Sequence, residues 1–149
     1  MSDITIRQAE LKDLDLLAPL FDAYRQFYNQ PSDLTAARQF MHERIQRGQS
    51  VVLLAFDGDR AVGFTQLYPS FSSVSLARSF VLNDFFVSDH CRMQGVGTKL
   101  LAAAVEYARS VRAIRLTLST AATNTTAQSI YERTGWKRDQ EFYVYHHTI

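Results

Sequence analysis

The sequence contains a single cysteine, Cys91, among its 149 residues. One thiol cannot form an internal disulfide, so we expect a reducing compartment and predict a cytoplasmic protein. The three prolines and six glycines do not cluster into a linker, and the chain has no internal repeat or low-complexity tract. These absences predict one domain that spans residues 1–149.

Long apolar runs and an excess of charge of one sign are also missing. No stretch approaches the ~18 apolar residues that a membrane span requires, and the opening MSDITIRQAE has no apolar signal-peptide core. The net charge of +1 gives no broad attraction to nucleic acid or anionic lipid. We therefore expect no nucleic-acid partner and no membrane partner. The remaining composition, 46% hydrophobic and 21% charged, is typical of a folded globular domain.

Hydrophobic periodicity predicts ten elements along the chain. Alternation or continuous apolar runs predict strands at 4–9, 51–56, 61–68, 79–87, 113–119 and 137–147, and helical spacing predicts helices at 13–28, 34–46, 95–111 and 124–133. Ser32 or Asp33 can cap the second helix, and Asp57-Gly58-Asp59 forms a tight turn. The order β-α-α-β-β-β-α-β-α-β predicts a mixed sheet with helices on its faces, in the α/β to α+β range.

The segment that carries most chemical information runs from Leu82 to Leu101, LNDFFVSDHCRMQGVGTKLL, where a strand ends and two glycines open a helix. The first amides of a helix lack partners within it and attract anions. Gly95 and Gly97 would let a phosphate approach the backbone, while Thr98 and Arg92 could add a hydroxyl and a cation. A GxxxxGK[ST] loop and a complete GxGxxG fingerprint are both absent. The alternative that the glycines merely shape the helix start remains open.

Arg92-Met93-Gln94-Gly95-Val96-Gly97 matches the pattern (Q/R)xxGx(G/A), and a second segment, ATNTTAQSIYERTGW, follows about 30 residues later. Together these motifs resemble the GCN5-related N-acetyltransferase (GNAT) superfamily, whose distal motif matches at Asn124, Ala127, Tyr131, Gly135 and Trp136. The resemblance covers nearly the whole chain. It implies a GNAT-type, mostly antiparallel central sheet flanked by helices, acetyl-CoA as co-substrate, direct transfer to a primary amine and a homodimer. Many members have Gly where this chain has Met93, so that side chain must point away from the diphosphate.

A narrower resemblance concerns Ala61–Phe64 (AVGF) and Leu82–Val87 (LNDFFV), which look like the diamine acetyltransferase branch that acts on spermidine, spermine and thialysine. That branch typically has Glu-Asp where this chain has Asn83-Asp84. The loss of one acidic group argues against a strongly polycationic substrate.

The family resemblance implies cofactor-binding roles for two stretches of backbone and for the distal motif. The predicted cofactor-binding residues are Phe85, Phe86, Val87, Arg92, Met93, Gln94, Gly95, Val96, Gly97, Thr98, Asn124, Ala127 and Tyr131. The strand residues would hold the pantetheine arm through main-chain groups, although Phe85 and Phe86 can equally be core side chains. Asn124 would contact the pantetheine or cap the helix that follows.

Two residues are the predicted catalytic groups, Tyr131 and Asp84. A phenol is neutral at pH 7 and can give a proton to the departing thiolate, which makes Tyr131 the general acid; the alternative is an aromatic core residue. Asp84 would attract the ammonium form of the acceptor and take part in removing its proton, directly or through water. The alternative for Asp84 is a carboxylate bonded to neighbouring structure.

The acceptor pocket of the resembling family lies between the first helices and the central strands. This places Tyr24, Phe27, Tyr28 and Asp33 at its rim, with Asn83 and Asp84 inside; the aromatic rings would attract a cation or simply pack. The four histidines show no metal-ligand spacing, and we expect no metal. We predict acetylation of a small-molecule amine such as a diamine, an amino acid or a lysine analogue. The alternatives are acetylation of a protein lysine or N-terminus, and a non-catalytic acyl-CoA-binding regulatory domain.

Overall fold

The chain divides into two compact units, Met1–Leu118 and Ser119–Ile149. The structure, a computed structural model, describes residues 3–92 and 95–149. Met93 and Gln94, both predicted to bind the cofactor, lie outside the described residues. The prediction of a single domain remains a prediction, and the two units are described separately below.

Eleven short and long elements follow one another along the described chain. They are β1 (Ile4–Gln8), a 3-10 helix (Leu11–Asp13), α1 (Leu14–Phe27), α2 (Leu34–Gln46), β2 (Val51–Asp57), β3 (Arg60–Ser72), β4 (Ala77–Val87), a second 3-10 helix (Asp89–Cys91), α3 (Val96–Ser110), β5 (Leu116–Thr117) and α4 (Thr125–Arg133). All belong to the first unit except α4.

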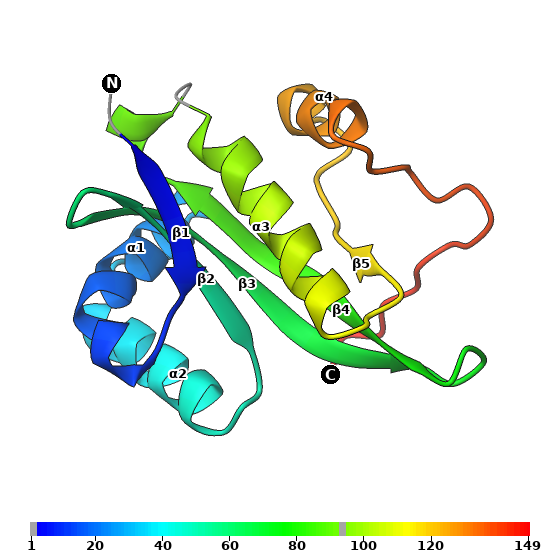
Figure 1. The fold of residues 1–149 in the computed structure, drawn as a ribbon, viewed down its shortest axis with the longest axis horizontal. Coiled ribbons are helices and arrows are strands. Elements are labelled where there is room, and N and C mark those ends of the chain that lie inside the picture. Colours follow the sequence, from blue (N-terminus) through cyan, green and yellow to red (C-terminus); the bar gives the residue numbers. More distant parts are fainter. Residues whose placement is uncertain (1–2, 93–94) are drawn as a thin grey trace. The chain divides into compact units, whose positions relative to one another are not determined.

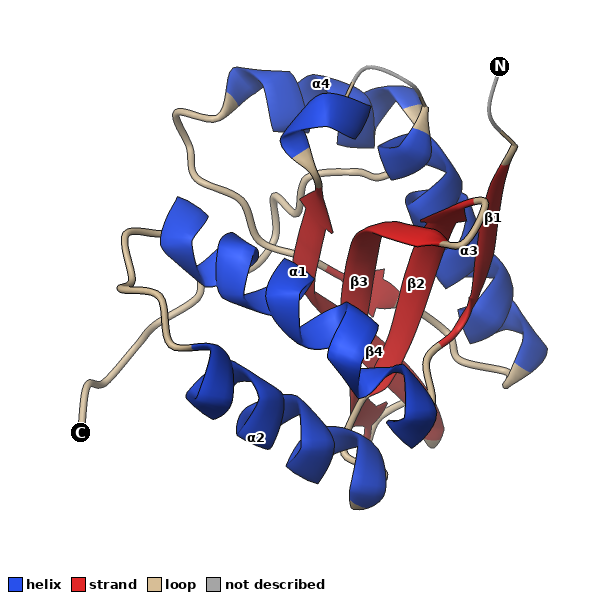
Figure 2. Cartoon of the chain, turned by 90° about the vertical axis from the view of Figure 1, so that its left-hand side faces the viewer, coloured by secondary structure: helices blue, strands red, loops and turns tan. Residues whose placement is uncertain are grey.

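The first unit is built on a five-stranded sheet in the order β1-β2-β3-β4-β5. The first three pairings are antiparallel, and β5 runs parallel to β4. Helices α1 and α2 cover one face of this sheet and α3 covers the other, as Figures 1 and 2 show. The predicted mixed, mostly antiparallel sheet with flanking helices is therefore confirmed.

The core beneath α1 and α2 follows from the alternation of β2. Val52, Leu54 and Phe56 point to this face and pack with Phe64 of β3 and with Leu17 of α1, and the five are 0 to 7% exposed. The residues between them, Leu53 and Ala55, are also buried because α3 covers the opposite face. A strand buried on both faces needs a continuous apolar run, which is what the sequence shows here.

The turn between α1 and α2 is held by a buried carboxylate. Asp22 accepts hydrogen bonds from the Ser32 hydroxyl at 2.7 Å and from the Asp33 backbone N–H at 2.8 Å. Asp33 in turn caps α2, because its side chain accepts from the Ala36 N–H at 3.1 Å. The predicted cap is thus Asp33, and the Asp22 bonds explain why the chain reverses between the helices.

Three predicted strands differ from the structure. The strand at 137–147 is wrong: within residues 119–149, all of which the structure describes, there is no strand. A strand forms only where a neighbouring edge completes its hydrogen bonds, and this unit contains one helix and no second strand. For the same reason the strand predicted at 113–119 shrinks to Leu116–Thr117, the two residues that pair with Phe80 and Val81. The β3–β4 hairpin is longer than predicted, extending β3 to Ser72.

On the other face, α3 approaches the sheet closely where β3 has a glycine. A Cβ on Gly63 would lie 2.9 Å from the Phe86 carbonyl oxygen and 3.3 Å from the Leu100 side chain. Leu100 itself is fully buried. A side chain at position 63 would therefore clash with the β4 backbone and crowd the Leu100 side chain of α3.

The end of β1 is fixed by an ion pair that also gives the first prediction. Arg7 donates from both terminal nitrogens to Asp13 at 2.8 Å, and Asp13 also accepts from the Glu10 N–H. These bonds, chiefly the one from Arg7, lower the pKa of Asp13 to about 2 from an ordinary 3.8. Because the folded-state pKa is lowered, the stabilisation is complete above pH 3.8 and is lost as the pH falls towards 2.

We therefore predict that Asp13→Asn lowers the free energy of unfolding by about 2 kcal/mol at pH 7. The deficit relative to wild type should shrink between pH 5 and pH 2. Urea unfolding at several pH values measures it, and Asp15→Asn is the matched control because the Asp15 side chain is 86% exposed. A deficit that stays constant with pH would contradict the assignment.

Candidate active site

The site begins with one extra residue in β4. Gln66 of β3 is opposite Asp84, but the next residue, Leu67, is opposite Leu82, so Asn83 has no partner in the ladder. Such a bulge reverses the alternation of side chains between the two faces of a sheet. As a result, Phe80 contacts Tyr107 of α3, whereas Phe86 contacts Tyr24 of α1.

The bulge places Asp84 on the face covered by α1 and α2. The Asp84 side chain accepts hydrogen bonds from the side-chain amides of Gln66 and of Asn83, the latter at 3.1 Å. Asp84 is 5% exposed and Gln66 is fully buried, while Asn83 is exposed. The predicted pair Asn83-Asp84 is therefore a buried carboxylate covered by an exposed amide.

Burial controls the ionisation of this group and of the phenols near it. Desolvation raises the pKa of Asp84 above its ordinary value, and hydrogen bonds from Gln66, Tyr24 and Asn83 act in the opposite direction. Burial, reinforced by the charge of Asp84, raises the pKa of Tyr68 to about 12 and also raises that of Tyr24. Both phenols are therefore neutral hydrogen-bond donors at pH 7, and Asp84 is a stronger base than an ordinary carboxylate.

The predicted acceptor rim lies beside this carboxylate only in part. The Tyr24 hydroxyl lies 3.4 Å from the Asn83 carbonyl oxygen, and its ring contacts Phe64, Phe86 and Tyr28. Tyr28 and Phe27 are about 60% exposed at the end of α1. Asp33 instead caps α2 with its carboxylate.

On its other edge, β4 is largely open. Its pairing with β5 covers Phe80 and Val81, and no strand among the described residues pairs with Leu82–Val87 on that side. Strand edges of this kind can bind an extended, amide-containing ligand as an additional strand, and Phe85, Phe86 and Val87 lie on this one. This is the stretch predicted to hold the pantetheine arm.

The start of α3 lies directly beside this open edge. A Cβ on Gly97 would lie 3.0 Å from the Phe85 ring, so Gly97 leaves room for a strand side chain rather than for a phosphate. Gly95 precedes the helix with φ +80°, and no described atom beyond its chain neighbours would come within 4 Å of a Cβ there. Val96 is buried and Thr98 exposed. The first amides of a helix lack partners within it and favour anions, and at this helix start Gly95 adds no side chain.

Arg92, the predicted phosphate-binding cation, is held at the end of β4. It donates to the Val87 carbonyl oxygen at 3.0 Å and pairs with Asp89 at 2.7 Å. Its guanidinium lies 5.6 Å from the ring centre of Phe27 and 5.7 Å from that of Phe86. The cation therefore lies between the end of α1 and the end of β4, with 42% of its side chain exposed.

The second unit carries the remaining predicted residues. Asn124 caps α4 by accepting from the Ala127 N–H at 3.1 Å, which confirms its capping role. The Tyr131 ring lies 6.1 Å from that of Trp136, and the Trp136 N–H donates to the Tyr131 carbonyl oxygen at 2.9 Å. Gly135 has φ +100° and permits this turn. The distal motif thus forms one local structure around the end of α4.

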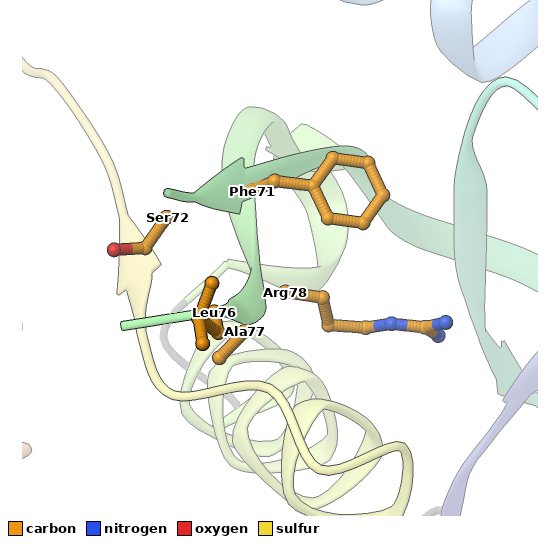
Figure 3. A pocket seen from close by; sticks show the side chains of 5 residues that line it. All are labelled: Phe71, Ser72, Leu76, Ala77 and Arg78. Carbon is orange, nitrogen blue, oxygen red and sulfur yellow. The ribbon is translucent and has the colours of Figure 1, made fainter. Parts of the chain in front are cut away.

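Other features of the described chain offer less chemistry. Residues 3–92 and 95–149 contain no group of three His, Cys, Asp or Glu side chains able to hold a metal ion, and none of their helices is long and apolar enough to cross a membrane. A hollow of about 370 Å³ lies at the end of the β3–β4 hairpin (Figure 3). Phe71, Ser72, Leu76, Ala77 and Arg78 line it. None of these residues has a carboxylate, and none is a hydrogen-bond partner of Asp84.

A five-stranded, mostly antiparallel sheet flanked by helices, with a glycine-containing helix start next to β4, is the architecture of GNAT acetyltransferases. The sequence profile of the acetyltransferase (GNAT) family matches residues 16–136. The chain belongs to this family, which uses acetyl-CoA as co-substrate, and is an acetyl-transferring enzyme.

Individual relatives agree. An uncharacterized N-acetyltransferase of Bacillus subtilis (strain 168), YhfO, is 46% identical over 142 residues, 95% of each chain. A probable acetyltransferase of Haemophilus influenzae is 32% identical over 110 residues, 73% of this chain and 75% of the relative. The crystal structure of a probable acetyltransferase, 46% identical, superposes with a TM-score of 0.93 over 97% of both chains.

The structure adds three residues to the site that the sequence did not single out. Gln66 donates a hydrogen bond to Asp84, and the charges of Asp84 and of Arg44 on α2 act in opposite directions on the pKa of Tyr68. A polar Gln in an otherwise apolar strand, VGFTQLY, was the available signal for the first of them. The other two follow from the three-dimensional arrangement of the chain, which no local pattern reveals.

The raised pKa of Asp84 gives the second prediction. Its folded-state pKa exceeds the ordinary 3.8, so Asp84 destabilises the fold increasingly as the pH rises above 3.8. We predict that Asp84→Asn raises the melting temperature at pH 8 relative to wild type and leaves it nearly unchanged below pH 4. Scanning calorimetry across this range is the measurement. The exposed Asp59, changed to Asn, is the control, and a gain of equal size at every pH would refute the argument.

Proposed function

We propose that the enzyme transfers the acetyl group of acetyl-CoA directly to a primary amine of a small molecule. The observation that carries this proposal is that two sides of β4 have different neighbours. Its stretch Phe85–Val87, with which no described strand pairs on the β5 side, adjoins the start of α3, and the carboxylate of Asp84 lies on the α1/α2 face near Tyr24. One strand therefore offers a donor site and an acceptor site a residue apart.

The donor side suits a long ligand with amides at one end and phosphates at the other. The backbone of Phe85–Val87 would hold the pantetheine arm, and the amides from Gly95 to Thr98, with Arg92 close by, would hold the diphosphate. Met93, Gln94, Asn124 and Ala127 complete the proposed set. The bound co-substrate supplies a thioester whose carbonyl carbon can accept an amine.

On the acceptor side, Asp84 would bind the amine and take up its proton. An alkylammonium group has a reference pKa of about 10.4 and must lose a proton before it can attack. A carboxylate with a raised pKa accepts that proton more readily than an exposed one. Tyr24, with Phe27, Tyr28 and Asn83 around it, would form the mouth of this pocket, and Asp33 would lie at its outer rim.

Tyr131 would act on the leaving group, the thiolate of coenzyme A. As the nitrogen–carbon bond forms and the carbon–sulfur bond breaks, the departing sulfur needs a proton, which a neutral phenol can donate. Its setting at the end of α4, next to Trp136, is fixed by the distal motif. A homodimer and a cytoplasmic location complete the proposal.

Binding of the co-substrate tests the donor side. We predict that Gly95→Ala weakens the affinity for acetyl-CoA about tenfold, because a side chain at φ +80° strains the turn by 1–2 kcal/mol and displaces the amides. Isothermal titration calorimetry measures the affinity. Gly58→Ala is the matched control: Gly58 also has a positive φ, +63°, and open surroundings, but lies in the β2–β3 turn. If both variants bound acetyl-CoA with the same affinity, the start of α3 would be excluded from the co-substrate site.

Turnover tests the chemistry. With saturating acetyl-CoA and a panel of primary amines, we predict thiol release by the wild type and a kcat about a hundredfold lower for Tyr131→Phe. Its acetyl-CoA affinity should be unchanged, because the ring remains. Tyr145→Phe, at an 89% exposed tyrosine, is the control. Full activity of Tyr131→Phe would exclude it as the acid, and binding of acetyl-CoA without turnover on any amine or peptide would indicate a regulatory domain instead.

A further inference from the structure

Gln66 is a polar side chain in the fully buried middle of β3. Its neighbours Phe64, Thr65 and Leu67 are also without solvent exposure. An amide buried in this way costs free energy unless it makes hydrogen bonds. Its N–H donates to the carboxylate of Asp84, which lies opposite it on β4, while its oxygen has no partner in the described part of the chain. The bond to Asp84 is therefore the interaction that this amide serves.

Strand β3 holds the backbone of Asp84 as well. The buried Thr65 hydroxyl donates to the Asp84 carbonyl oxygen at 2.8 Å. A bulge interrupts the regular ladder of a sheet, and Asn83, the extra residue, has no partner in the β3–β4 register. Two consecutive side chains of β3 thus fix the main chain and the carboxylate of Asp84 next to the bulge.

Both carboxylate oxygens of Asp84 accept hydrogen bonds from uncharged amides. Gln66 donates to Oδ2, and Asn83 donates to Oδ1 at 3.1 Å. Within residues 3–92 and 95–149, none of the ion pairs includes Asp84. A buried carboxylate without a cation is ionised only as far as hydrogen bonds compensate for the water it has lost.

The titratable groups packed around Asp84 supply no counter-ion either. Tyr24 of α1 and Tyr68 of β3 respond to the charge of Asp84, and both are neutral at pH 7 because burial raises their pKa. On α2, Arg44 acts on the pKa of Tyr68 but forms its ion pair with Glu43, at 3.1 Å. The charge state of Asp84 therefore depends on its amide donors.

Burial and the Gln66 amide have opposite effects on Asp84. Burial raises the pKa of Asp84, and among the hydrogen bonds that lower it the one from Gln66 has the largest effect. An arginine or lysine in place of this amide would hold the carboxylate ionised so firmly that it could not take up a proton near neutral pH. An apolar side chain would leave it protonated. A neutral donor keeps it ionised and still basic.

We infer that Gln66 is a positioning residue for acetyl transfer, whose amide holds the Asp84 carboxylate ionised within the fold and ready to take up a proton from the acceptor. This inference rests on the proposed function. In that step an N–H bond of the acceptor's ammonium group breaks and an O–H bond forms on Asp84, directly or through water. The nitrogen keeps the electron pair and attacks the thioester carbonyl carbon with it. Gln66 is fully buried and acts only through Asp84.

The dependence of kcat/KM on pH tests this role. Gln66→Met preserves the length of the side chain but removes the donor, so more of Asp84 is protonated at a given pH. With a primary amine that the wild type acetylates and saturating acetyl-CoA, we expect the acid limb of the profile to move up by about one pH unit or more. Activity at high pH should approach that of the wild type. The ionisation of the amine is common to both enzymes and cancels in the comparison.

Gln39→Met is the matched control. Gln39 also donates its side-chain amide to a carboxylate, that of Glu43 at 2.9 Å, but on the exposed surface of α2. The pH profile of this control should coincide with that of the wild type. A Gln66→Met profile that is lowered by the same factor at every pH, or that equals the wild type, overturns the inference, because Gln66 would then only fill space.

A second variant keeps the test open if Gln66→Met fails to fold, which thermal unfolding would reveal. Gln66→Glu has nearly the same shape and places a second carboxyl group next to Asp84. Two adjacent carboxyl groups cannot both ionise readily, so the acid limb should move up in this variant as well. An unchanged limb in a folded Gln66→Glu enzyme overturns the inference.

Calorimetry measures the same hydrogen bond without turnover. Asp84→Asn should raise the melting temperature at pH 8 by more in the Gln66→Met background than in the wild-type background, by about 3 °C or more, because the carboxylate has already lost its donor. Equal gains in the two backgrounds overturn the inference. Absence of turnover on every amine, with this calorimetric difference intact, is instead a failure of the proposed function: Gln66 would hold Asp84 ionised, but not for acetyl transfer.

Discussion

The arrangement of the site depends on the extra residue that Asn83 introduces into β4. Up to Leu82, even-numbered side chains of β4 point towards α3; after the bulge, Asp84 and Phe86 point towards α1. Without it, Asp84 would lie under α3 and Phe85 would lie under α1. The bulge therefore places the buried carboxylate of Asp84 on one face and the Phe85 ring, next to Gly97 of α3, on the other.

Close packing keeps the two faces in register. Gly63 lets α3 approach the sheet, and Gly97 receives the Phe85 ring, so the start of α3 cannot move without moving β4. On the opposite face, Tyr24 packs against both Phe64 and Phe86. Residues that bind the two proposed substrates thus share neighbours through the strand, and a rigid sheet positions them relative to each other.

Most of the fold was predictable because it follows from local patterns. The apolar run at Val51–Phe56 marks a strand buried on both sides, Asp33 marks a helix start, and the glycine pattern after Val87 marks the start of α3. The strand predicted at 137–147 failed because alternation states only which residues could form a strand. The partner edge is a property of the whole sheet, and the unit of residues 119–149 has none.

The site was predictable in part for a similar reason. Asp84 and Tyr24 stand in recognisable contexts, and the structure brings them together. Gln66 became visible as a partner of Asp84 only once the bulge was known, since a regular strand would have placed Asp84 on the opposite face. Family motifs emphasise backbone groups for the co-substrate, which all members share, and say little about side chains for the acceptor.

The surroundings of Asp84 differ from those that the likeness to the diamine branch implies. That branch typically has two adjacent acids, a pair suited to a polycation. Here Asn83 stands at the position of one acid and donates a hydrogen bond to the other. Replacing an acid by an amide removes one negative charge beside Asp84. Under the proposed function, a single carboxylate is better matched to an acceptor with one ammonium group nearby than to a polycation, because each further positive charge would lack a partner.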